Sequence, residues 1–329
     1  MKIGFDMTRS WRSFGLALIM MLAIGLAPIR QASAQDSGRL KVVATFSILG
    51  DVVQNVAGDN VDLTVIVGPD GDAHTFEPKP DQIASLADAN LIFENGIGFE
   101  TWLDDMYSAS GSSATRVAVS DGLPLLAFNG QADVPATPHT SDDGHDHGEH
   151  DPHVWQDVSN VIAEVGVIRD ALIAADPAHA EAYTANAAAY TTQLQELDAK
   201  IKQMVGTLPA EKRILVTSHD SLGYIAHAYG FTIAGTALGS VSTEGADPSA
   251  GDIARLMDQI KATGVPAIFA ENVESQDLMN QIARDAGVTL APPLYTDALS
   301  KSDGPAATYI ALMTYNATTI VTALGGQAG

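Results

Sequence analysis

The sequence predicts an α/β fold made of two similar α/β domains with mainly parallel sheets. Two observations indicate this fold. Short apolar runs typical of buried strands alternate with segments of helical periodicity on both sides of the middle of the chain, and parallel strands covered by helices on both faces have this pattern. Between the two alternating regions lies one long amphipathic segment, from residue 183 to residue 208. We therefore expect two domains bridged by a long rigid helix.

Residues 1–34 are predicted to be a cleavable signal peptide. Lys2 and Arg9 give the segment a basic start, an apolar stretch follows at 16–28, and small residues at 32–34 form a cleavage site. The apolar stretch is shorter than the roughly 20 residues that a membrane-spanning helix needs. The chain contains no cysteine, so we expect an exported, soluble protein with neither a lipid nor a disulfide.

The first α/β domain is predicted at 35–156. In chain order it alternates strands at 40–46, 61–67 and 90–95 with helices at 47–58, 81–89 and 100–107. Turn residues at 68–72 end the second strand. Functional residues of parallel sheets gather in loops beyond the carboxyl ends of the strands, and His74 lies in such a loop. A glycine pair at 96–98 is too weak a signal to indicate a phosphate site.

Residues 157–208 are predicted to be helical. Asp176 followed by Pro177 is typical of a helix start. In the next helix, apolar residues recur at alternating spacings of four and three from Tyr183 to Leu208, which corresponds to about 40 Å of helix. We interpret this helix as a rigid strut packed along both domains. A coiled-coil dimer is the alternative, but the seam is short and contains Ala and Tyr, so we expect a monomer.

The second α/β domain is predicted at 209–329. Its strands are expected at 213–219, 231–237, 265–272 and 288–292, and its helices at 221–230, 248–264, 276–287 and from about residue 305. His219 ends the first of these strands, and Asp297 lies in a loop after the last. Two candidate polar residues thus occur at strand ends or loops in each half, counting His74 and His153 in the first.

The most distinctive stretch is an acidic, histidine-rich loop at 129–151. Its histidines are His139, His145, His147 and His150, and with His153 just beyond it they make five of the nine histidines of the chain. Imidazoles and carboxylates bind borderline divalent ions, zinc above all. A solvated acidic loop is the alternative. Only His153 is followed by apolar residues, so we expect it alone of the five to be fixed against a core.

The formal net charge of −23 disfavours binding to nucleic acid and to anionic lipid. It would attract small cations to the surface, although most acidic proteins use such charge only for solubility. The charge therefore excludes nucleic-acid partners and is consistent with a cation ligand.

Several segments, in this order, resemble the metal-specific substrate-binding proteins of bacterial ABC importers, which take up zinc or manganese. They include VVATFSILGD at 42–51, DAHTFEP at 72–78, DPHVWQD at 151–157, SHDSLGY at 218–224 and FAENVESQ at 269–276. The resemblance implies a protein of the periplasm, with metal in the cleft between its two domains. It also implies delivery of the metal to the membrane permease of an importer, and no enzymatic activity.

The resemblance also implies a ligand set. Carried over residue by residue, the metal ligands fall on His74, His153, His219 and Asp297. Apart from the resemblance, we expect Glu271 to be a supporting group behind these ligands; a catalytic base or an additional oxygen ligand are its alternative roles. Manganese members usually have a glutamate where this chain has His219, which implies the zinc branch. Three imidazoles and one carboxylate suit four-coordinate Zn²⁺, whereas manganese prefers more oxygen ligands. Copper would accept the same ligands on affinity alone.

The loop histidines have a different expected role from the four ligands, and two alternative functions remain. We expect the loop histidines to be auxiliary, low-affinity zinc ligands that collect the ion near the cleft or receive it from a periplasmic metallochaperone. A manganese-binding importer component is one alternative function. An exported zinc-dependent hydrolase is another, but four protein ligands leave no open position for the water that a hydrolase activates.

Overall fold

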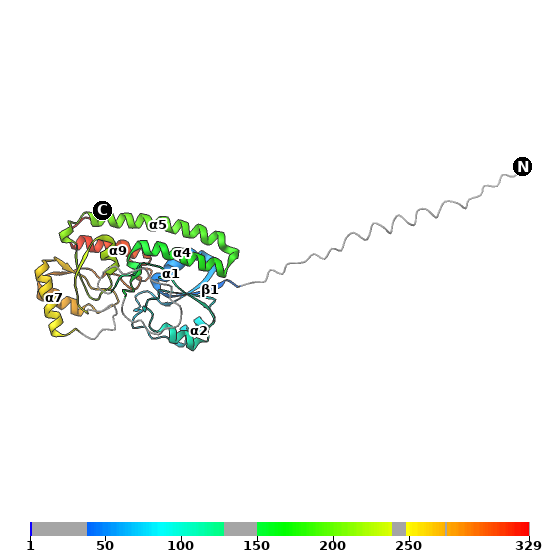
Figure 1. The fold of residues 1–329 in the computed structure, drawn as a ribbon, viewed down its shortest axis with the longest axis horizontal. Helices are drawn as coiled ribbons and strands as arrows, with labels where there is room; N and C mark the ends of the chain where they lie inside the picture. The colour runs from blue at the N-terminus through cyan, green and yellow to red at the C-terminus, as the bar shows by residue number, and fades with distance from the viewer. Residues whose placement is uncertain (2–37, 128–149, 239–247, 274, 329) are drawn as a thin grey trace. The chain divides into compact units, whose positions relative to one another are not determined.

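Two groups of parallel strands and a long helix organise the chain, as Figure 1 shows for the computed structural model. The structure describes Met1 and residues 38–127, 150–238, 248–273 and 275–328. Apart from Met1, the predicted signal peptide lies outside the described residues, and so do His139, His145 and His147. Within the described part, no helix is long and apolar enough to cross a membrane.

The first half contains a four-stranded, all-parallel sheet with the order β2-β1-β3-β4. Its strands are β1 (Leu40–Phe46), β2 (Val61–Val67), β3 (Leu91–Glu94) and β4 (Thr115–Ala118), and its helices are α1 (Ser47–Ala57), α2 (Pro80–Ala87) and α3 (Leu103–Ser110). The central strand β1 is buried over its last five residues. Strand β4 was not predicted. It is short and lies at the edge of the sheet with no buried residue, so its sequence shows neither an apolar run nor an alternation.

The second half is built from two parallel strand pairs. Its strands are β5 (Ile214–Thr217), β6 (Thr232–Thr236), β7 (Ala267–Ile268) and β8 (Thr289–Leu290), and its helices are α6 (Gly223–Tyr229), α7 (Ala250–Thr263), α8 (Asp277–Ala286) and α9 (Tyr309–Ala323). The backbone N–H of Phe269 donates to the carbonyl of Val216 at 2.9 Å, which joins the two pairs side by side.

Strands β7 and β8 are shorter than predicted. Pro292 and Pro293 follow β8 and have no N–H to donate to a ladder. Pairing resumes beyond them as an isolated bridge between Glu271 and Leu294. The loop that carries Asp297 begins directly after this bridge.

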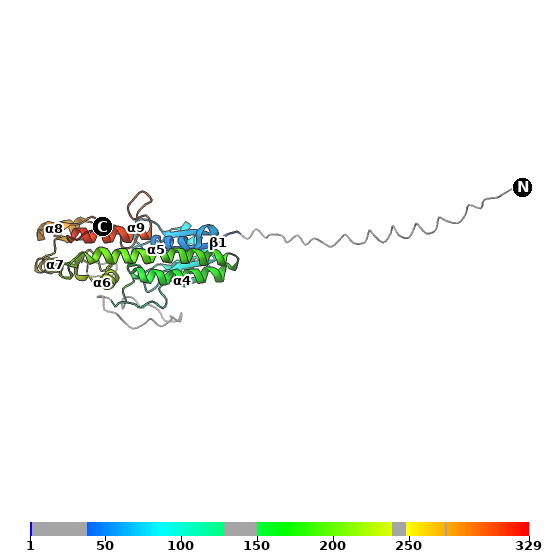
Figure 2. The ribbon, with the colours of Figure 1, turned by 90° about the horizontal axis from the view of Figure 1, so that it is seen from above.

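The helices between the halves are α4 (Val158–Ala175) and α5 (Ala180–Gly206). The predicted seam of α5, from Tyr183 to Leu208, is buried throughout. Helix α5 packs against α4, against α1 of the first half and against α6 and α9 of the second. Both views show α4 and α9 beside different lengths of α5 (Figures 1 and 2). The expectation of two α/β halves bridged by a long helix is therefore confirmed.

In the described part of the chain there are also four 3₁₀ turns: η1 (Gly58–Asn60), η2 (Val154–Gln156), η3 (Pro177–His179) and η4 (Ala210–Lys212). The predicted boundaries at residues 156 and 208 remain a prediction, because Arg39–Gly329 forms one compact unit.

Candidate metal site

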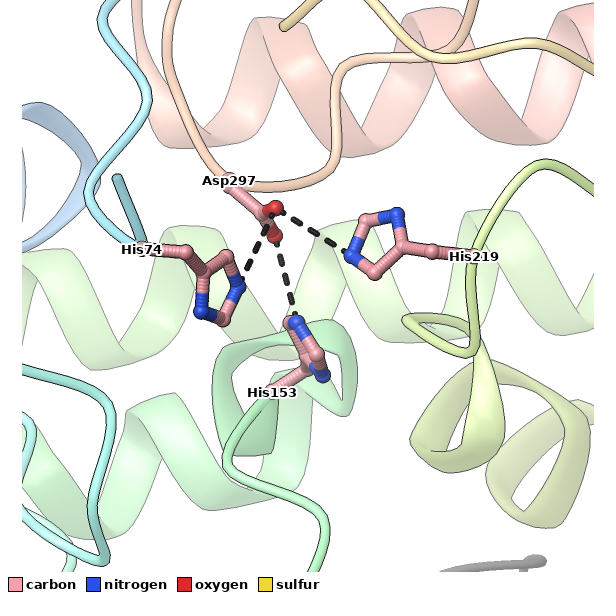
Figure 3. A group of neighbouring side chains, drawn as sticks. All are labelled: His74, His153, His219 and Asp297. Carbon is pink, nitrogen blue, oxygen red and sulfur yellow. Dashed lines mark ion pairs between the residues drawn. The ribbon is translucent and has the colours of Figure 1, made fainter. Parts of the chain in front are cut away.

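The structure brings together four buried residues that lie far apart in the sequence: His74, His153, His219 and Asp297. One nitrogen or oxygen atom from each lies within 4.8 Å of the corresponding atoms of the others. Figure 3 shows the carboxylate of Asp297 facing the three imidazole rings. His74 is 5% exposed and the other three are fully buried, so solvent hardly reaches this group.

Asp297 occupies the centre of the group. Its Oδ1 lies 3.5 Å from Nε2 of His153, and its Oδ2 lies 3.4 Å from Nε2 of His219 and 3.6 Å from Nε2 of His74. Tetrahedral Zn²⁺ ligands at ordinary bond lengths of about 2.0–2.1 Å would be separated by about 3.3–3.4 Å. The distances from Asp297 are close to that separation, while the four ligand atoms as a group lie within 4.8 Å of one another, so a small ion could be held here if the side chains moved closer together.

Several buried polar atoms of the group have no hydrogen-bond partner in the described part of the chain. Among the described residues, Nε2 of His74, Nε2 of His153 and both carboxylate oxygens of Asp297 are buried and make no hydrogen bond. Buried polar atoms are almost always satisfied by a partner, and one explanation for an exception is an ion absent from the coordinates. Four such atoms facing one another are what a cation site requires.

His74 lies in the loop after β2. The carboxylate of Asp72 accepts hydrogen bonds from the backbone N–H of His74 and from the hydroxyl of Thr75, both at 2.8 Å, and a turn closed by an aspartate side chain in this way fixes the backbone locally. The ring of Phe99 packs edge-on against the His74 ring, with 4.8 Å between centroids. The imidazole is therefore held by a polar turn on one side and an apolar ring on the other.

His153 directly precedes the turn η2, and the buried side chains of Val154 and Trp155 anchor that turn. Asp151 Oδ1 accepts the backbone N–H of His153 at 3.0 Å and lies 2.7 Å from Nδ1 of its ring. A carboxylate on one ring nitrogen selects the tautomer that leaves the other nitrogen free to bind a metal, and it makes the ring more basic. Nε2 of His153 is the nitrogen that faces Asp297.

His219 follows β5, and Glu271 holds it from behind. Glu271 Oε2 lies 2.8 Å from Nδ1 of His219, and Glu271 Oε1 accepts the backbone N–H of the same residue at 3.1 Å. Glu271 also accepts hydrogen bonds from the hydroxyls of Ser218, Ser221 and Thr296 at 2.8, 2.9 and 2.6 Å. Both carboxylate oxygens are thus engaged on the side of His219 away from Asp297.

The electrostatics of the group favour charged carboxylates. Burial raises the pKa of Asp297, but His153 and His219 lower it by more, so this pKa lies well below its usual value. Burial also raises the pKa of Glu271, and His219 brings it below its usual value. The carboxylates in turn oppose the effect of burial on the imidazoles: burial lowers the pKa of His153, whereas Asp297 and Asp151 raise it above its usual value. The carboxylates thus favour positive charge on the imidazoles, and a bound cation would supply that positive charge in place of the imidazole protons.

Residue-level reasoning from the sequence missed Asp151 and Thr296. The role of Asp151 could have been predicted, because it stands two residues before a candidate ligand, and an Asp side chain commonly accepts the backbone N–H two residues further on. Thr296 could not, since its role depends on contacts across the two halves. His150 is described, but it lies outside the group of four; its backbone forms an antiparallel bridge with Ala127.

Comparisons with known proteins identify the family. The family profile described as zinc-uptake complex component A, periplasmic (ZnuA), matches residues 42–323. The manganese-binding lipoprotein MntA of Halalkalibacterium halodurans is 36% identical over 95% of this chain and 97% of its own length. The manganese ABC transporter substrate-binding lipoprotein PsaA of Streptococcus pneumoniae is 32% identical over 92% of this chain and 94% of its own.

A solved structure has a fold similar to that of this chain. The periplasmic zinc-binding protein TroA of Treponema pallidum superimposes with a TM-score of 0.76 at 33% identity, covering 87% of this chain and 99% of that one. The names of these proteins include both zinc and manganese, so they support a metal-binding role without agreeing on the metal.

The localisation predicted from the sequence is wrong. A soluble protein of the periplasm without a lipid was expected, but the relatives from H. halodurans and S. pneumoniae are both named as lipoproteins, and acyl chains hold such proteins at a membrane. The prediction rested on the absence of cysteine from the chain. The absence of one residue type does not decide where a protein is held.

The family consists of transport proteins that bind their cargo and not of enzymes, so the hydrolase alternative is set aside. The match extends over both α/β halves and over all four residues of the buried group. The chain belongs to the family of zinc-uptake complex component A, the periplasmic metal-binding components of ABC metal importers.

Proposed function

We propose that this protein binds Zn²⁺ through His74, His153, His219 and Asp297 and delivers it to the membrane permease of an ABC importer. The observation that carries the proposal is the donor set: three imidazole nitrogens and one carboxylate face one another in a buried group. Such a set suits a four-coordinate borderline ion. In this proposal Zn²⁺ is the cargo, and the protein carries out no chemical step on it.

The position of Glu271 supports zinc over manganese. Manganese prefers more oxygen ligands than Asp297 alone provides, and Glu271 is the nearest additional carboxylate. Its oxygens already accept hydrogen bonds from three hydroxyls and one backbone N–H. Turning Glu271 toward the metal would break these bonds in a buried environment, where an unsatisfied donor costs about 1–3 kcal/mol.

Manganese is the second candidate, and the names of two relatives favour it. MntA and PsaA are both named for manganese, whereas TroA is named for zinc. A relative at about one third identity can differ in a single ligand, and one ligand is enough to change the preferred metal. The difference expected from the sequence is at His219, where manganese members usually have a glutamate.

A competition titration tests the choice of metal. Metal-free protein is loaded with one equivalent of Zn²⁺ and titrated with Mn²⁺, with bound metal measured after gel filtration. We expect a large excess of Mn²⁺ not to displace Zn²⁺, and we expect His219→Glu to shift the preference toward Mn²⁺. Mn²⁺ binding by the unaltered protein that is as tight as, or tighter than, Zn²⁺ binding would refute the zinc assignment.

The histidine-rich loop has an auxiliary part in this proposal. His139, His145, His147 and His150 would bind Zn²⁺ weakly, because any ordering that metal binding imposes on a chain segment costs about 1–2 kcal/mol per residue. They would raise the local concentration of the ion near the buried group, or accept it from a periplasmic metallochaperone. The protein would act as a monomer, with its division at 35–156, 157–208 and 209–329 as predicted.

A further inference from the structure

Thr296 directly precedes the candidate ligand Asp297 and is fully buried. Its backbone carbonyl accepts two hydrogen bonds from the turn that follows His153: from Nε1 of Trp155 at 2.7 Å and from Nε2 of Gln156 at 2.8 Å. Its hydroxyl donates to Oε2 of Glu271 at 2.6 Å. Thr296 thus contacts the turn that follows His153 and the carboxylate that contacts His219, and it is the chain neighbour of Asp297.

The loop that contains Asp297 is tied to the first half, although the residue belongs to the second half by sequence. Beyond Asp297, the backbone N–H of Leu299 donates to Oγ of Ser47 at 3.0 Å, and the carbonyl of Leu299 accepts the N–H of Asp70 at 2.8 Å. Together with the two bonds to the Thr296 carbonyl, these contacts attach the loop to α1, to the loop after β2 that carries His74, and to the turn that follows His153. The position of Asp297 is therefore tied to the segments of the first half that carry His74 and His153.

His219 is anchored differently. It follows β5 of the second half, and the carboxylate of Glu271, which follows β7, holds both its backbone N–H and its ring. The hydroxyl of Thr296 is a direct link between this Glu271–His219 pair and the loop of Asp297. Any separation of the two halves that moved His219 away from Asp297 would have to break this bond or carry the loop with it.

We propose that Thr296 is a positioning residue for the metal site, which joins the Glu271–His219 pair to the other three ligands through its hydroxyl. The carbonyl of Thr296 sets Asp297 relative to His153, and the hydroxyl sets Glu271, and through it His219, relative to Asp297. Without the hydroxyl, the fourth ligand is less restrained and a bound ion leaves faster by loss of His219. This inference rests on the proposed metal site, but it does not depend on which metal is bound.

The chain offers a matched control for the bond itself. The hydroxyl of Thr45 donates to Oε1 of Glu100, also at 2.6 Å, and Thr45 is likewise fully buried. Thr45→Val and Thr296→Val each replace a hydroxyl by a methyl group of similar size, and each removes one donor from a buried carboxylate. A purely structural role of the Thr296 hydroxyl would therefore affect the protein in the same way as the loss of the Thr45 hydroxyl.

The test measures metal release from the full-length protein. Protein loaded with one equivalent of Zn²⁺ is mixed rapidly with an excess of a chromogenic chelator, and Co²⁺-loaded protein reports coordination through its visible absorption. We expect Thr296→Val to release Zn²⁺ about tenfold faster or more, the size of effect typical of a lost hydrogen bond to a charged group, and to alter the Co²⁺ spectrum. Thr296→Ser keeps the hydroxyl and should release the ion nearly as slowly as the unaltered protein, and Thr45→Val should behave like the unaltered protein.

The outcomes separate the inference from the function on which it rests. Release from Thr296→Val at the unaltered rate, or equal acceleration in Thr45→Val, would overturn the positioning role while leaving the metal site intact. Circular dichroism spectra that match the unaltered protein exclude unfolding as the cause, and rescue by Thr296→Ser provides a second check. If the unaltered protein bound no Zn²⁺ tightly, or if the His219→Ala variant bound it as tightly as the unaltered protein, the proposed function would fail first.

Discussion

From the contact between Asp151 and His153 we predict that the charge of Asp151 strengthens Zn²⁺ binding. Asp151 Oδ1 lies 2.7 Å from Nδ1 of the His153 ring and accepts its backbone N–H at 3.0 Å. In Asp151→Asn the amide oxygen can still accept both bonds, so the ring orientation and the tautomer are kept while the negative charge is lost. The variant therefore isolates the effect of the charge on the basicity of the imidazole.

The expected effect is a loss of Zn²⁺ affinity of about 10- to 100-fold, the range typical of changes to the partners of ligating histidines, which equals about 1.4–2.7 kcal/mol. Gly223 adds a second perturbation of the same carboxylate. A Cβ atom at Gly223 would collide with Oδ2 of Asp151, so Gly223→Ala should displace the carboxylate and lower the affinity by a similar factor.

Affinity is measured by competition with a chelator of known Zn²⁺ affinity at pH 7.5. Asp157→Asn is the matched control: Asp157 caps α4 by accepting the backbone N–H of Ser159 at 2.8 Å, and it is not among the four residues of the buried group. Because Asn caps helices about as well as Asp, this change should leave both the affinity and the thermal stability nearly unchanged. Asp151→Asn protein that binds Zn²⁺ as tightly as the unaltered protein would refute the view that Asp151 tunes His153.

Three further predictions follow from the same structure. His219→Ala should weaken Zn²⁺ binding by orders of magnitude with an unchanged circular dichroism spectrum, and an unchanged dissociation constant would contradict the four-ligand site. Burial raises the pKa of Glu164 from 4.5 to about 8, so the folded state keeps this proton where the unfolded chain has lost it, and stability should fall by about 1.4 kcal/mol per pH unit as pH rises between these values. Glu164→Gln should remove that slope from urea unfolding of the metal-free protein, whereas the exposed Glu196→Gln should not; equal slopes in all three proteins would show that Glu164 ionises normally. Replacing His139, His145 and His147 by Ser should lower the total Zn²⁺ bound, measured by equilibrium dialysis, and leave the tightest site unchanged; loss of the tight site would place a primary ligand in the loop.

Much of the fold could be predicted from local sequence. Strands β1 and β2 have the predicted bounds. Both are rich in apolar and β-branched residues, and the turn residues from Gly68 onward mark the end of β2. The seam of α5 was evident from its regular spacing, since a helix that packs along both halves needs apolar residues on one face over its whole length. Strand β4 and the short strands β7 and β8 were missed or overextended, because edge position and prolines after the strand outweigh local preference.

The sequence by itself determined which residues were candidates for the site. Three histidines and an aspartate at strand ends or in loops are visible in the chain, and so are the apolar residues Val154 and Trp155 that directly follow His153. Only the tertiary structure decided that one nitrogen or oxygen atom from each lies within 4.8 Å of the others, and that Asp151 and Glu271 hold the outer ring nitrogens. The physical reason is distance along the chain: the bond from Trp155 to the carbonyl of Thr296 joins residues 141 positions apart, and no local pattern of polarity or periodicity encodes such a pairing.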